Sequence, residues 1–164
     1  MKREEVIKGN NIKEYYMRIA LSLAEKAQRK DEVPIGAIIV LDGKIIAKAI
    51  NLVERTNLAT MHAEMIAIKK ASKKLKSKRL LGAEMYVTLE PCPMCAGAIA
   101  NARMSKVYFG AYEQKSGCAV SKYPVLSDSG LNHSVEYEGG VLEEECSKII
   151  KDYFKKKRAE KTLT

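Results

Sequence analysis

The sequence predicts an α/β fold, a three-layer α/β/α domain in which helices flank a mixed five-stranded sheet. Two observations predict this class. Segments typical of strands alternate along the chain with segments whose apolar residues recur at helical spacing. In addition, the chain has no internal repeat, low-complexity tract or Pro/Gly-rich linker, and its 164 residues match the size of one domain spanning 1–164.

The first third of the chain predicts a helix followed by a β-hairpin. A capping-box-like pattern begins at Asn11, and apolar residues then recur at helical spacing over 11–29. The segment Val33–Leu41 is β-branched and apolar, and Lys44–Ile50 alternates in polarity. The intervening pair Asp42-Gly43 is typical of a tight turn, so the two segments are expected to pair.

The rest of the chain continues the alternation of strands and helices. The expected elements are a helix over 63–76, a strand over 83–89, a short helix over 93–102, strands over 106–109 and 135–137, and a helix from 141 to about 158. Residues 110–134 are rich in Gly, Ser, Tyr and Pro. We expect them to form a long ordered loop, a kind of segment that often serves function.

The positive charge is concentrated in two segments. The formal net charge is +9, but acids slightly outnumber bases outside residues 69–79 and 151–161. Clustered lysine and arginine favour a polyanionic partner, because each neutralised phosphate releases counterions. The alternative is a solvated helix face, and we favour it slightly for 69–79. Near the end of the chain, Lys155–Arg158 follows Phe154, and this pairing of aromatic and basic groups favours RNA binding, with Phe154 and Arg158 as contacts.

The sequence predicts a cytoplasmic protein without a membrane partner. Its opening residues lack the apolar run of a secretory signal, and no stretch has the length and apolarity of a membrane span. In that setting the four cysteines are interpreted as thiols or metal ligands rather than as disulfides.

Two of the cysteines indicate a metal site. Cys92 and Cys95 are three residues apart at the predicted start of a helix, where both sulfurs can reach one ion and where the helix dipole favours thiolates. His62 and Glu64 lie at the start of another predicted helix. Their spacing of two residues would point them about 200° apart on an ideal helix, so periodicity alone does not predict that they converge.

The set of ligands favours a catalytic zinc site over a structural one. A closed structural site needs a fourth Cys or His, and the chain has no second C-x-x-C or finger-like His pair. Three protein ligands with water in the fourth position is the catalytic arrangement, in which zinc lowers the pKa of water from about 15.7 to about 7. We therefore expect one zinc ion per chain, held by His62, Cys92 and Cys95.

At these residues the sequence resembles the cytidine/deoxycytidylate deaminase superfamily. That superfamily combines H-x-E with a later P-C-x-x-C, and its glutamate is a general acid/base rather than a ligand. Here the two motifs are His62-Ala63-Glu64 and Pro91-Cys92-Pro93-Met94-Cys95. The resemblance implies a cytidine-deaminase-like fold, with Glu64 as the catalytic residue.

Within the superfamily, the chain most resembles the bacterial-type tRNA adenosine deaminases, over about residues 14–158. Further matching segments are Val33–Ala37, Asn51, Val107–Ala111, Lys115–Gly117, Leu131–His133 and Asp152–Phe154. The resemblance implies that a homodimer converts adenosine to inosine at the wobble position of the tRNA anticodon arm. It also implies that Asn51 contacts the nucleoside, that the Ala63 N–H holds the base or the attacking oxygen, and that Glu113 touches neighbouring RNA.

The sequence departs from that family at two places. Leu58–Met61 stands where the family has Asp-Pro-Thr-Ala, and Glu113 replaces an aspartate. Both departures concern how the protein binds the anticodon arm, and they leave the zinc ligands and Glu64 unchanged. Two other readings stay open: a deaminase of small cytosine, guanine or cytidine compounds, and a catalytically silent zinc-stabilised RNA-binding module, against which the intact Glu64 argues.

Three further residues with chemical potential are not assigned to the site. Cys146 lies on an apolar helix stripe and Cys118 lies between small residues, so neither is expected to carry chemistry. His133 is expected to close a turn or to contact RNA, and it is not included among the metal ligands.

Overall fold

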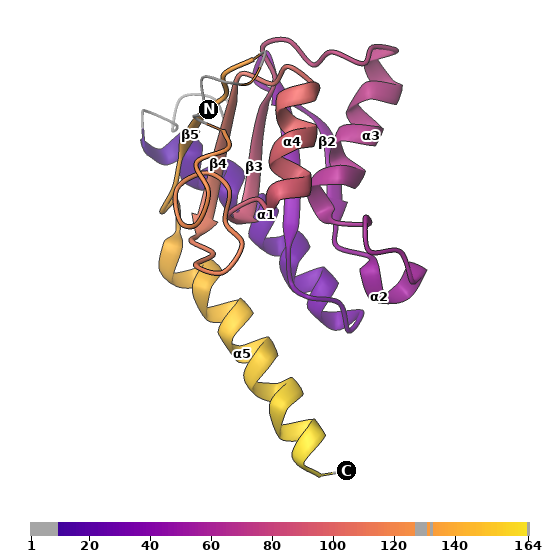
Figure 1. The fold of residues 1–164 in the computed structure, drawn as a ribbon, viewed down its shortest axis with the longest axis vertical. Helices are drawn as coiled ribbons and strands as arrows, with labels where there is room; N and C mark the ends of the chain where they lie inside the picture. Colours follow the sequence, from indigo (N-terminus) through magenta and orange to yellow (C-terminus); the bar gives the residue numbers. More distant parts are fainter. Residues whose placement is uncertain (1–9, 127–130, 132, 164) are drawn as a thin grey trace, which may run out of the picture.

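The computed structural model describes residues 10–126, 131 and 133–163, and Figure 1 shows how its elements are layered. In chain order these elements are α1 (Asn10–Arg29), β1 (Gly36–Leu41), β2 (Lys44–Ile50), α2 (Val53–Thr56), α3 (Ala63–Leu75), β3 (Glu84–Leu89), α4 (Pro93–Asn101), β4 (Lys106–Ala111), β5 (Glu136–Glu138) and α5 (Glu143–Thr162).

A mixed sheet forms the middle layer. Within the described residues its five strands follow the order β2-β1-β3-β4-β5. β1 is antiparallel to both β2 and β3, whereas β3, β4 and β5 are parallel. The predicted hairpin turn is present: Asp42 and Gly43 have φ of 51° and 73°, as a type I′ turn requires at both central positions.

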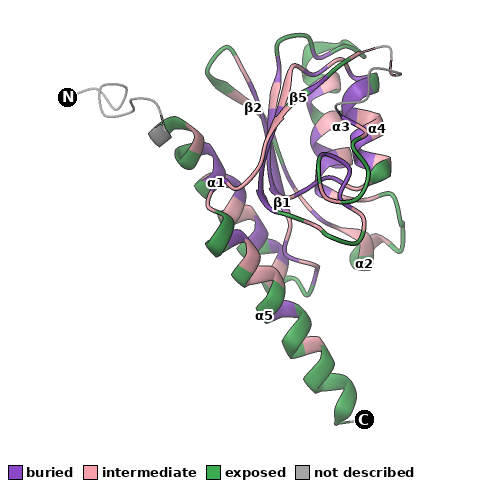
Figure 2. Cartoon of the chain, turned by 60° about the vertical axis from the view of Figure 1, so that its left-hand side comes forward, coloured by how far each residue is buried: buried purple, intermediate pink, exposed green. Residues whose placement is uncertain are grey.

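The two faces of the sheet are covered by different helices. Alternate strand residues such as Ile38 and Tyr86 pack with buried residues of α1 and α5, and their neighbours Ile39 and Val87 pack with those of α3 and α4. Figure 2 shows α1 and α5 on one side of the buried strands and α3 and α4 on the other. The predicted three-layer α/β/α architecture is therefore confirmed.

The approach of α1 to the sheet depends on small residues. α1 buries Ala20, Ala24 and Ala27 completely, and Gly36 of β1 faces this alanine stripe. A Cβ placed on Gly36 would lie 2.7 Å from the Leu23 Cβ and 2.8 Å from the Ala24 N, and closer still to the Ala20 carbonyl oxygen. No side chain fits at residue 36 unless helix and strand separate.

Gly36→Ala is consequently expected to destabilise the protein by about 3 kcal/mol, because the helix backbone has to move to make room. Thermal unfolding should show a Tm lower by about 10 °C. The control is Gly97→Ala in α4, where nothing lies within 4 Å of the added Cβ. Equal Tm values for the two variants would contradict this account of the α1 packing.

Differences from the predicted elements include the start of β1, the presence of α2 and the end of α5. β1 begins at Gly36 instead of Val33, because Pro34 has no N–H and the Ile35 N–H donates to the Val33 carbonyl at 2.8 Å. α2 was not predicted, since its first turn is held by the distant Glu32 rather than by a local cap. α5 continues to Thr162, beyond the expected end near 158.

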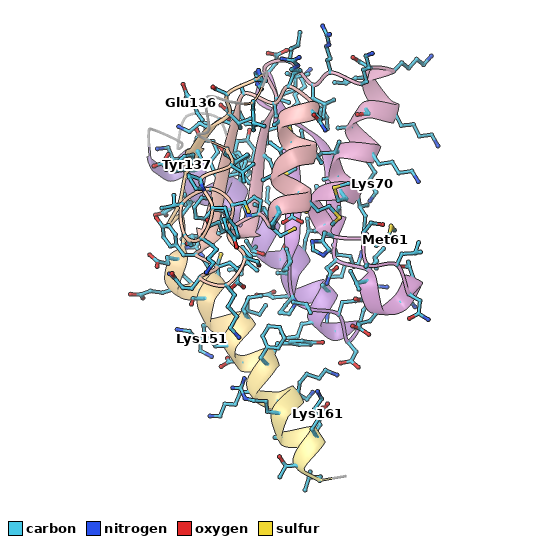
Figure 3. The ribbon with its side chains drawn as sticks, viewed as in Figure 1. Met61, Lys70, Glu136, Tyr137, Lys151 and Lys161 are labelled. Atoms are coloured by element: carbon cyan, nitrogen blue, oxygen red, sulfur yellow. The ribbon has the colours of Figure 1, made fainter. Side chains whose placement is uncertain are left out.

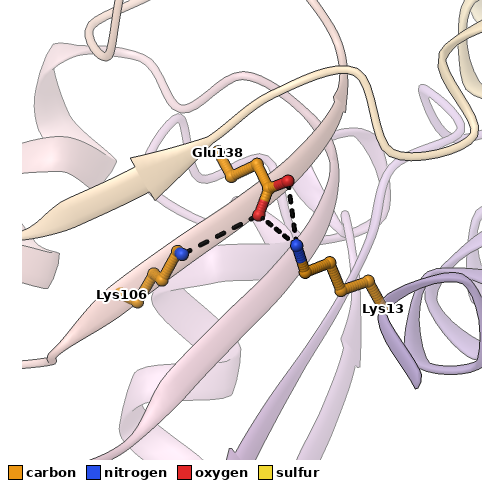
Figure 4. Close-up of polar contacts among 3 residues, drawn as sticks. All are labelled: Lys13, Lys106 and Glu138. Carbon is orange, nitrogen blue, oxygen red and sulfur yellow. Dashed lines mark hydrogen bonds and ion pairs between the residues drawn. The ribbon is translucent and has the colours of Figure 1, made fainter. Parts of the chain in front are cut away.

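The edge strand β5 is joined to the rest of the fold by an ion-pair cluster. The Glu138 carboxylate lies 2.9 Å from the Lys13 Nζ of α1 and 3.7 Å from the Lys106 Nζ of β4, as Figure 4 shows. Lys106 also lies over the Tyr108 ring, 4.7 Å from its centroid. These contacts help to hold the short edge strand against β4.

Some of the sequence-based expectations concern residues that the structure does not describe. The Asn11 side chain, residues 127–130 of the predicted loop and Asn132 all lie outside the described set. Across the helices that the structure does describe, none combines the length and apolarity needed to cross a membrane.

Candidate metal centre and substrate site

His62 lies immediately before α3 rather than within it. It is the N-cap residue, with extended backbone angles of φ −71° and ψ 153°, and Glu64 is the second residue of the helix. The 100° rotation per residue of a helix therefore does not apply between them. This extended residue allows His62 and Glu64 to face the same point, which periodicity did not predict.

Cys92 occupies the corresponding position before α4. It is the N-cap residue, Pro93 follows at the first helical position, and Cys95 is the third residue of the helix. Cys92 lies outside the helix, as the predicted span 93–102 implies, and its φ of −75° and ψ of 174° are extended, so the helical rotation per residue does not apply between the two cysteines. Because an N-cap side chain reaches toward the third helical residue, the two sulfurs still converge.

The structure brings His62, Cys92 and Cys95 together. Their ligand atoms all lie within 4.8 Å of one another. The His62 Nδ1 is 3.6 Å from the Cys92 Sγ and 3.5 Å from the Cys95 Sγ. Tetrahedral zinc, about 2.3 Å from sulfur and 2.1 Å from nitrogen, separates such atoms by about 3.6 Å. The three side chains thus fit a zinc ion in both chemistry and spacing.

The two thiols differ in their affinity for protons. Hydrogen bonding from Cys95, with a further contribution from His62, lowers the pKa of Cys92 to about 4. The same contact with Cys92, together with burial, raises the pKa of Cys95. Cys92 therefore holds a proton less tightly than Cys95, and a cation bound by both sulfurs would favour loss of the remaining proton.

Glu64 is a buried acid in contact with the ligand group. Its side chain is only 3% exposed, and the Cys95 Sγ lies 3.4 Å from its Oε2. Burial raises the pKa of Glu64, and the neighbouring His62 opposes this shift. A cation at the three ligands would also oppose it, because positive charge favours the carboxylate. Such opposing influences suit a group that both accepts and donates protons during a reaction.

The fold places this group where two helices begin. α4 follows directly from the carboxyl end of β3, and α3 begins nearby, on the same face of the sheet. In Figure 1 both helices start at the lower edge of the sheet, beside α2. The amino ends of helices carry partial positive charge, which favours thiolates there and anionic groups on a substrate.

Asn51 begins the segment that leads from β2 to His62. It is buried, with 4% exposed, and its side chain bonds the Val33 carbonyl and the Val53 N–H, each at 3.4 Å. The next residue, Leu52, donates its N–H to the Met61 carbonyl at 3.0 Å. This bond places Asn51 close to the residue that precedes His62.

The buried carboxylate of Glu32 holds the middle of the same segment. It accepts the N–H groups of Glu54 at 3.0 Å and Arg55 at 2.6 Å, in the first turn of α2. The departure at Leu58–Met61 forms a turn closed by the Met61 N–H on the Leu58 carbonyl at 3.1 Å. Figure 3 shows Met61 between α2 and the start of α3.

The resemblance also implies substrate contacts for the Ala63 backbone N–H and for Glu113. Ala63 is buried as the first residue of α3, a position whose N–H has no acceptor inside the helix, and the His62 side chain does not cap it. Glu113 lies in the loop after β4, half buried. Its N–H donates to the Glu90 Oε1 at 3.1 Å, and its Oε1 accepts the Lys115 N–H at 3.0 Å.

Phe154 and Arg158 are not brought to the metal ligands. Both are exposed on α5, which packs on the opposite face of the sheet from α3 and α4. The carboxyl half of α5 extends past the lower sheet edge in Figure 1, and Figure 3 marks Lys151 and Lys161 along it. Lys157 pairs with Asp31 at 2.6 Å, next to Glu32.

The residues left out of the site are accounted for structurally. The His133 Nε2 lies 2.7 Å from the Met104 carbonyl, so this histidine closes a loop contact. Cys118 and Cys146 are completely buried free thiols.

Glu90 is a residue near the site to which sequence reasoning assigned no role, although it directly precedes the motif Pro91–Cys95. Its carboxylate is buried directly before Pro91 and Cys92 and accepts several hydrogen bonds from the loop after β4. A buried acid among apolar and proline residues was the available signal, since such a group needs partners.

Comparison with known proteins agrees with this geometry. A model of the MafB19-like deaminase family matches residues 11–158. A tRNA-specific adenosine deaminase of Bacillus subtilis is 48% identical over 156 residues, which cover 92% of this chain and 97% of that protein. One of Aquifex aeolicus is 49% identical over 146 residues, which cover 89% of this chain and 96% of that protein. The chain belongs to the tRNA-specific adenosine deaminase family. The resemblance inferred from the motifs is thereby confirmed.

Solved structures of the family and of a related deaminase also match. One from a study of A-to-I editing by tRNA:A34 deaminases has a TM-score of 0.79 and 42% identity, with 82% of this chain and 98% of that chain covered. A guanine deaminase from Bacillus subtilis has a TM-score of 0.57 and 38% identity, with 68% and 66% covered. The tRNA:A34 deaminase structure therefore matches this chain over a larger part of both chains, and with a higher TM-score, than the guanine deaminase does.

Proposed function

We propose that this chain is a zinc-dependent hydrolytic deaminase that converts adenosine to inosine at the wobble position of tRNA anticodons. The observation that supports this most strongly is the contact of buried Glu64 with a His62, Cys92 and Cys95 group, in a chain that matches tRNA-specific adenosine deaminases over nearly their whole length. The acid lies beside the ligands, where a proton carrier for hydrolysis is needed.

One zinc ion per chain would be held by His62, Cys92 and Cys95. When bound, it supplies the Lewis acidity that lowers the pKa of water toward neutrality. Cys92 and Cys95 would both bind it as thiolates, since the thiolate is the form of cysteine that binds metals. Three protein ligands leave a coordination position for the reaction, as in catalytic rather than structural zinc sites.

Glu64 carries the protons of the reaction. Its carboxylate takes one proton from the attacking water as an oxygen–carbon bond forms at C6 of adenine, and delivers this proton to N1 of the ring. It then takes the second proton from the hydroxyl group now on C6 and delivers it to the departing amine. The C6–nitrogen bond then breaks, ammonia leaves and inosine remains. Burial of Glu64 excludes bulk water from this transfer and keeps its carboxyl group able to hold a proton.

The segments around the ligands position the substrate. Asn51 is proposed to bind the target nucleoside, since its polar side chain lies at the base of the segment that leads to His62. The Ala63 N–H, uncapped at the start of α3, is suited to hold an oxygen or the base. Glu113 is proposed to contact RNA next to the flipped base.

We further propose that α5 binds the anticodon arm through Phe154 and Arg158. Phe154 is 42% exposed and is followed by exposed Lys155 and Lys156, a combination of stacking and charged groups suited to RNA. The triple variant Lys155→Ser/Lys156→Ser/Arg158→Ser is expected to bind tRNA more weakly, with the slope of log K against log salt reduced by about 2. Binding assays at several salt concentrations measure this slope.

A matched triple variant controls for net charge. Lys74, Lys76 and Lys78 are exposed cations near the carboxyl end of α3, and serine substitutions there remove the same charge. They are expected to leave the slope nearly unchanged, consistent with a solvated face. An equal reduction in both triple variants would argue against a specific role for α5.

We also propose that the protein is a cytoplasmic homodimer, as the family resemblance implies. Light scattering should give a mass close to twice the 18.3 kDa of one chain. A mass of one chain at assay concentrations would exclude the dimer as the working form.

A second candidate substrate is free guanine, because a guanine deaminase is 38% identical over part of the chain. The experiment that decides is incubation of the purified zinc-loaded protein with total tRNA, followed by sequencing for A-to-I changes, with guanine and cytidine assayed in parallel. Inosine at the wobble position with no release of ammonia from guanine or cytidine supports the proposal. The reverse result would assign the chain to small substrates.

A further inference from the structure

Glu90 is the centre of a hydrogen-bond cluster that organises the loop after β4. Its Oε2 accepts the N–H groups of Ala119, Val120 and Ser121 at 3.1, 2.9 and 3.0 Å. Its Oε1 accepts the Glu113 N–H at 3.1 Å and the Ser121 hydroxyl. One buried carboxylate therefore binds both ends of a nine-residue loop segment, residues 113–121.

The same loop is attached to the backbone beside the metal ligands. The Cys118 N–H donates to the Pro91 carbonyl at 2.8 Å, directly before Cys92, and the Glu90 N–H donates to the Ala111 carbonyl at 2.9 Å. The loop thus lies against the strand-to-helix connection that presents Cys92. Any shift of Glu90 changes where the loop lies relative to the ligands.

Gly117 allows the carboxylate to approach the loop. A Cβ at this residue would lie 2.5 Å from the Glu90 Oε1 and would also collide with the Glu113 carbonyl oxygen. The absence of a side chain at 117 and the buried acid at 90 are therefore two parts of one arrangement, contributed by distant parts of the sequence.

We propose that Glu90 is a positioning residue that holds Glu113, through its backbone N–H, at the place where it meets the RNA substrate. The inference rests on the proposed function for the role of Glu113, and on the hydrogen bonds alone for the role of Glu90. Glu90 does not touch the substrate. It acts by fixing both ends of the 113–121 loop segment.

Glutamine at residue 90 would release one end of this segment selectively. If its amide NH₂ replaced Oε2, it would face three N–H donors. If it replaced Oε1, it would face one N–H, from Glu113, and a Ser121 hydroxyl that can rotate to accept. The orientation with the NH₂ in the place of Oε1 costs less free energy, because only one backbone N–H, that of Glu113, then faces another donor. Glu90→Gln should consequently free Glu113 while keeping Ala119 to Ser121 bound.

The first test measures backbone hydrogen exchange in the zinc-loaded protein without substrate. In Glu90→Gln the Glu113 amide should exchange at least about tenfold faster, while the Val120 amide changes little and zinc content stays the same. Unchanged exchange at Glu113, or loss of zinc, would overturn the proposal. Because no substrate is present, the result is independent of whether the chain deaminates tRNA.

The second test compares kinetics on tRNA. Glu90→Gln is expected to lower kcat/KM by about tenfold to 100-fold, mainly through KM, because a displaced loop weakens substrate placement. Combined with Glu113→Ala it should cause no further loss, since both act through the same side chain. If the losses in kcat/KM of the two variants were additive in the double variant, the proposal that Glu90 acts through Glu113 would be contradicted. If the wild-type chain does not deaminate tRNA, the proposed function fails while the exchange test still decides the role of Glu90.

Two glycine variants and a serine variant complete the design. Gly117→Ala should reproduce the loss in kcat/KM, because its Cβ pushes against Glu90, whereas Gly97→Ala in open space should not. Ser121→Ala removes one donor and keeps the carboxylate, so it should shift KM in the same direction by about twofold. If Glu90→Gln failed to fold, a KM unchanged in Ser121→Ala and Gly117→Ala would overturn the proposal.

Discussion

Replacing Glu64 by glutamine is expected to lower kcat on tRNA by about 100-fold to 10,000-fold, the range that a general acid/base contributes. Glutamine has nearly the same volume and keeps an oxygen available to the Cys95 sulfur, but it cannot take a proton from water. Because Glu64 is buried beside the ligands and is not one of them, zinc content should remain about one per chain. Single-turnover kinetics with metal analysis measure both quantities.

Glu64→Asp provides the graded comparison. A shorter acid can still exchange protons but reaches less far, so its activity should fall between that of the wild type and that of Glu64→Gln. Near wild-type turnover in Glu64→Gln would remove Glu64 from the chemistry. Loss of zinc in that variant would instead make it a determinant of the metal site.

Replacing Cys95 by alanine is expected to weaken zinc binding by more than about 100-fold, beyond the effect of losing an indirect contact. Cys95 is buried and lies 3.5 Å from the His62 Nδ1, so its loss leaves two of the three candidate ligands. Deaminase activity should disappear with the metal. Chelator competition with a zinc indicator measures the affinity.

The control for Cys95→Ala is another buried thiol. Cys146 of α5 is also completely buried, but it packs on the opposite face of the sheet, against Gly110 of β4. Cys146→Ala removes the same atom and should leave zinc affinity and activity unchanged, with only a small loss of stability from the cavity. Zinc binding of wild-type strength in Cys95→Ala would show that Cys95 is not a ligand.

Much of the fold was predictable because its signals are local. Asp42 and Gly43 adopt the two positive φ angles of a type I′ turn, and Pro93 starts α4 because a missing N–H costs nothing there. The near-continuous apolar runs of β1 and β3 likewise predict strands that are buried on both faces, and so a layer of helices on each face. These features depend on residues adjacent in the chain.

The candidate ligands were also predictable, since spacing and residue type indicate zinc at Cys92 and Cys95. Their geometry was predicted less well. The extended N-cap conformations of His62 and Cys92 decide how the side chains meet, and helix periodicity does not describe a residue outside the helix. The convergence of His62 with Glu64 is a property of the place where α3 begins.

What the sequence determined by itself is therefore the class of fold, through turns, caps and apolar periodicity, and the set of candidate ligand side chains, through residue type and spacing. Only the tertiary structure decided that Glu32 holds α2 and that Glu90 holds the loop at Glu113. In both cases a buried carboxylate satisfies backbone N–H groups more than 20 residues away along the chain. The physical reason is that such partners are chosen by burial in the folded protein, where an unpaired charge is too costly, and no local pattern records them.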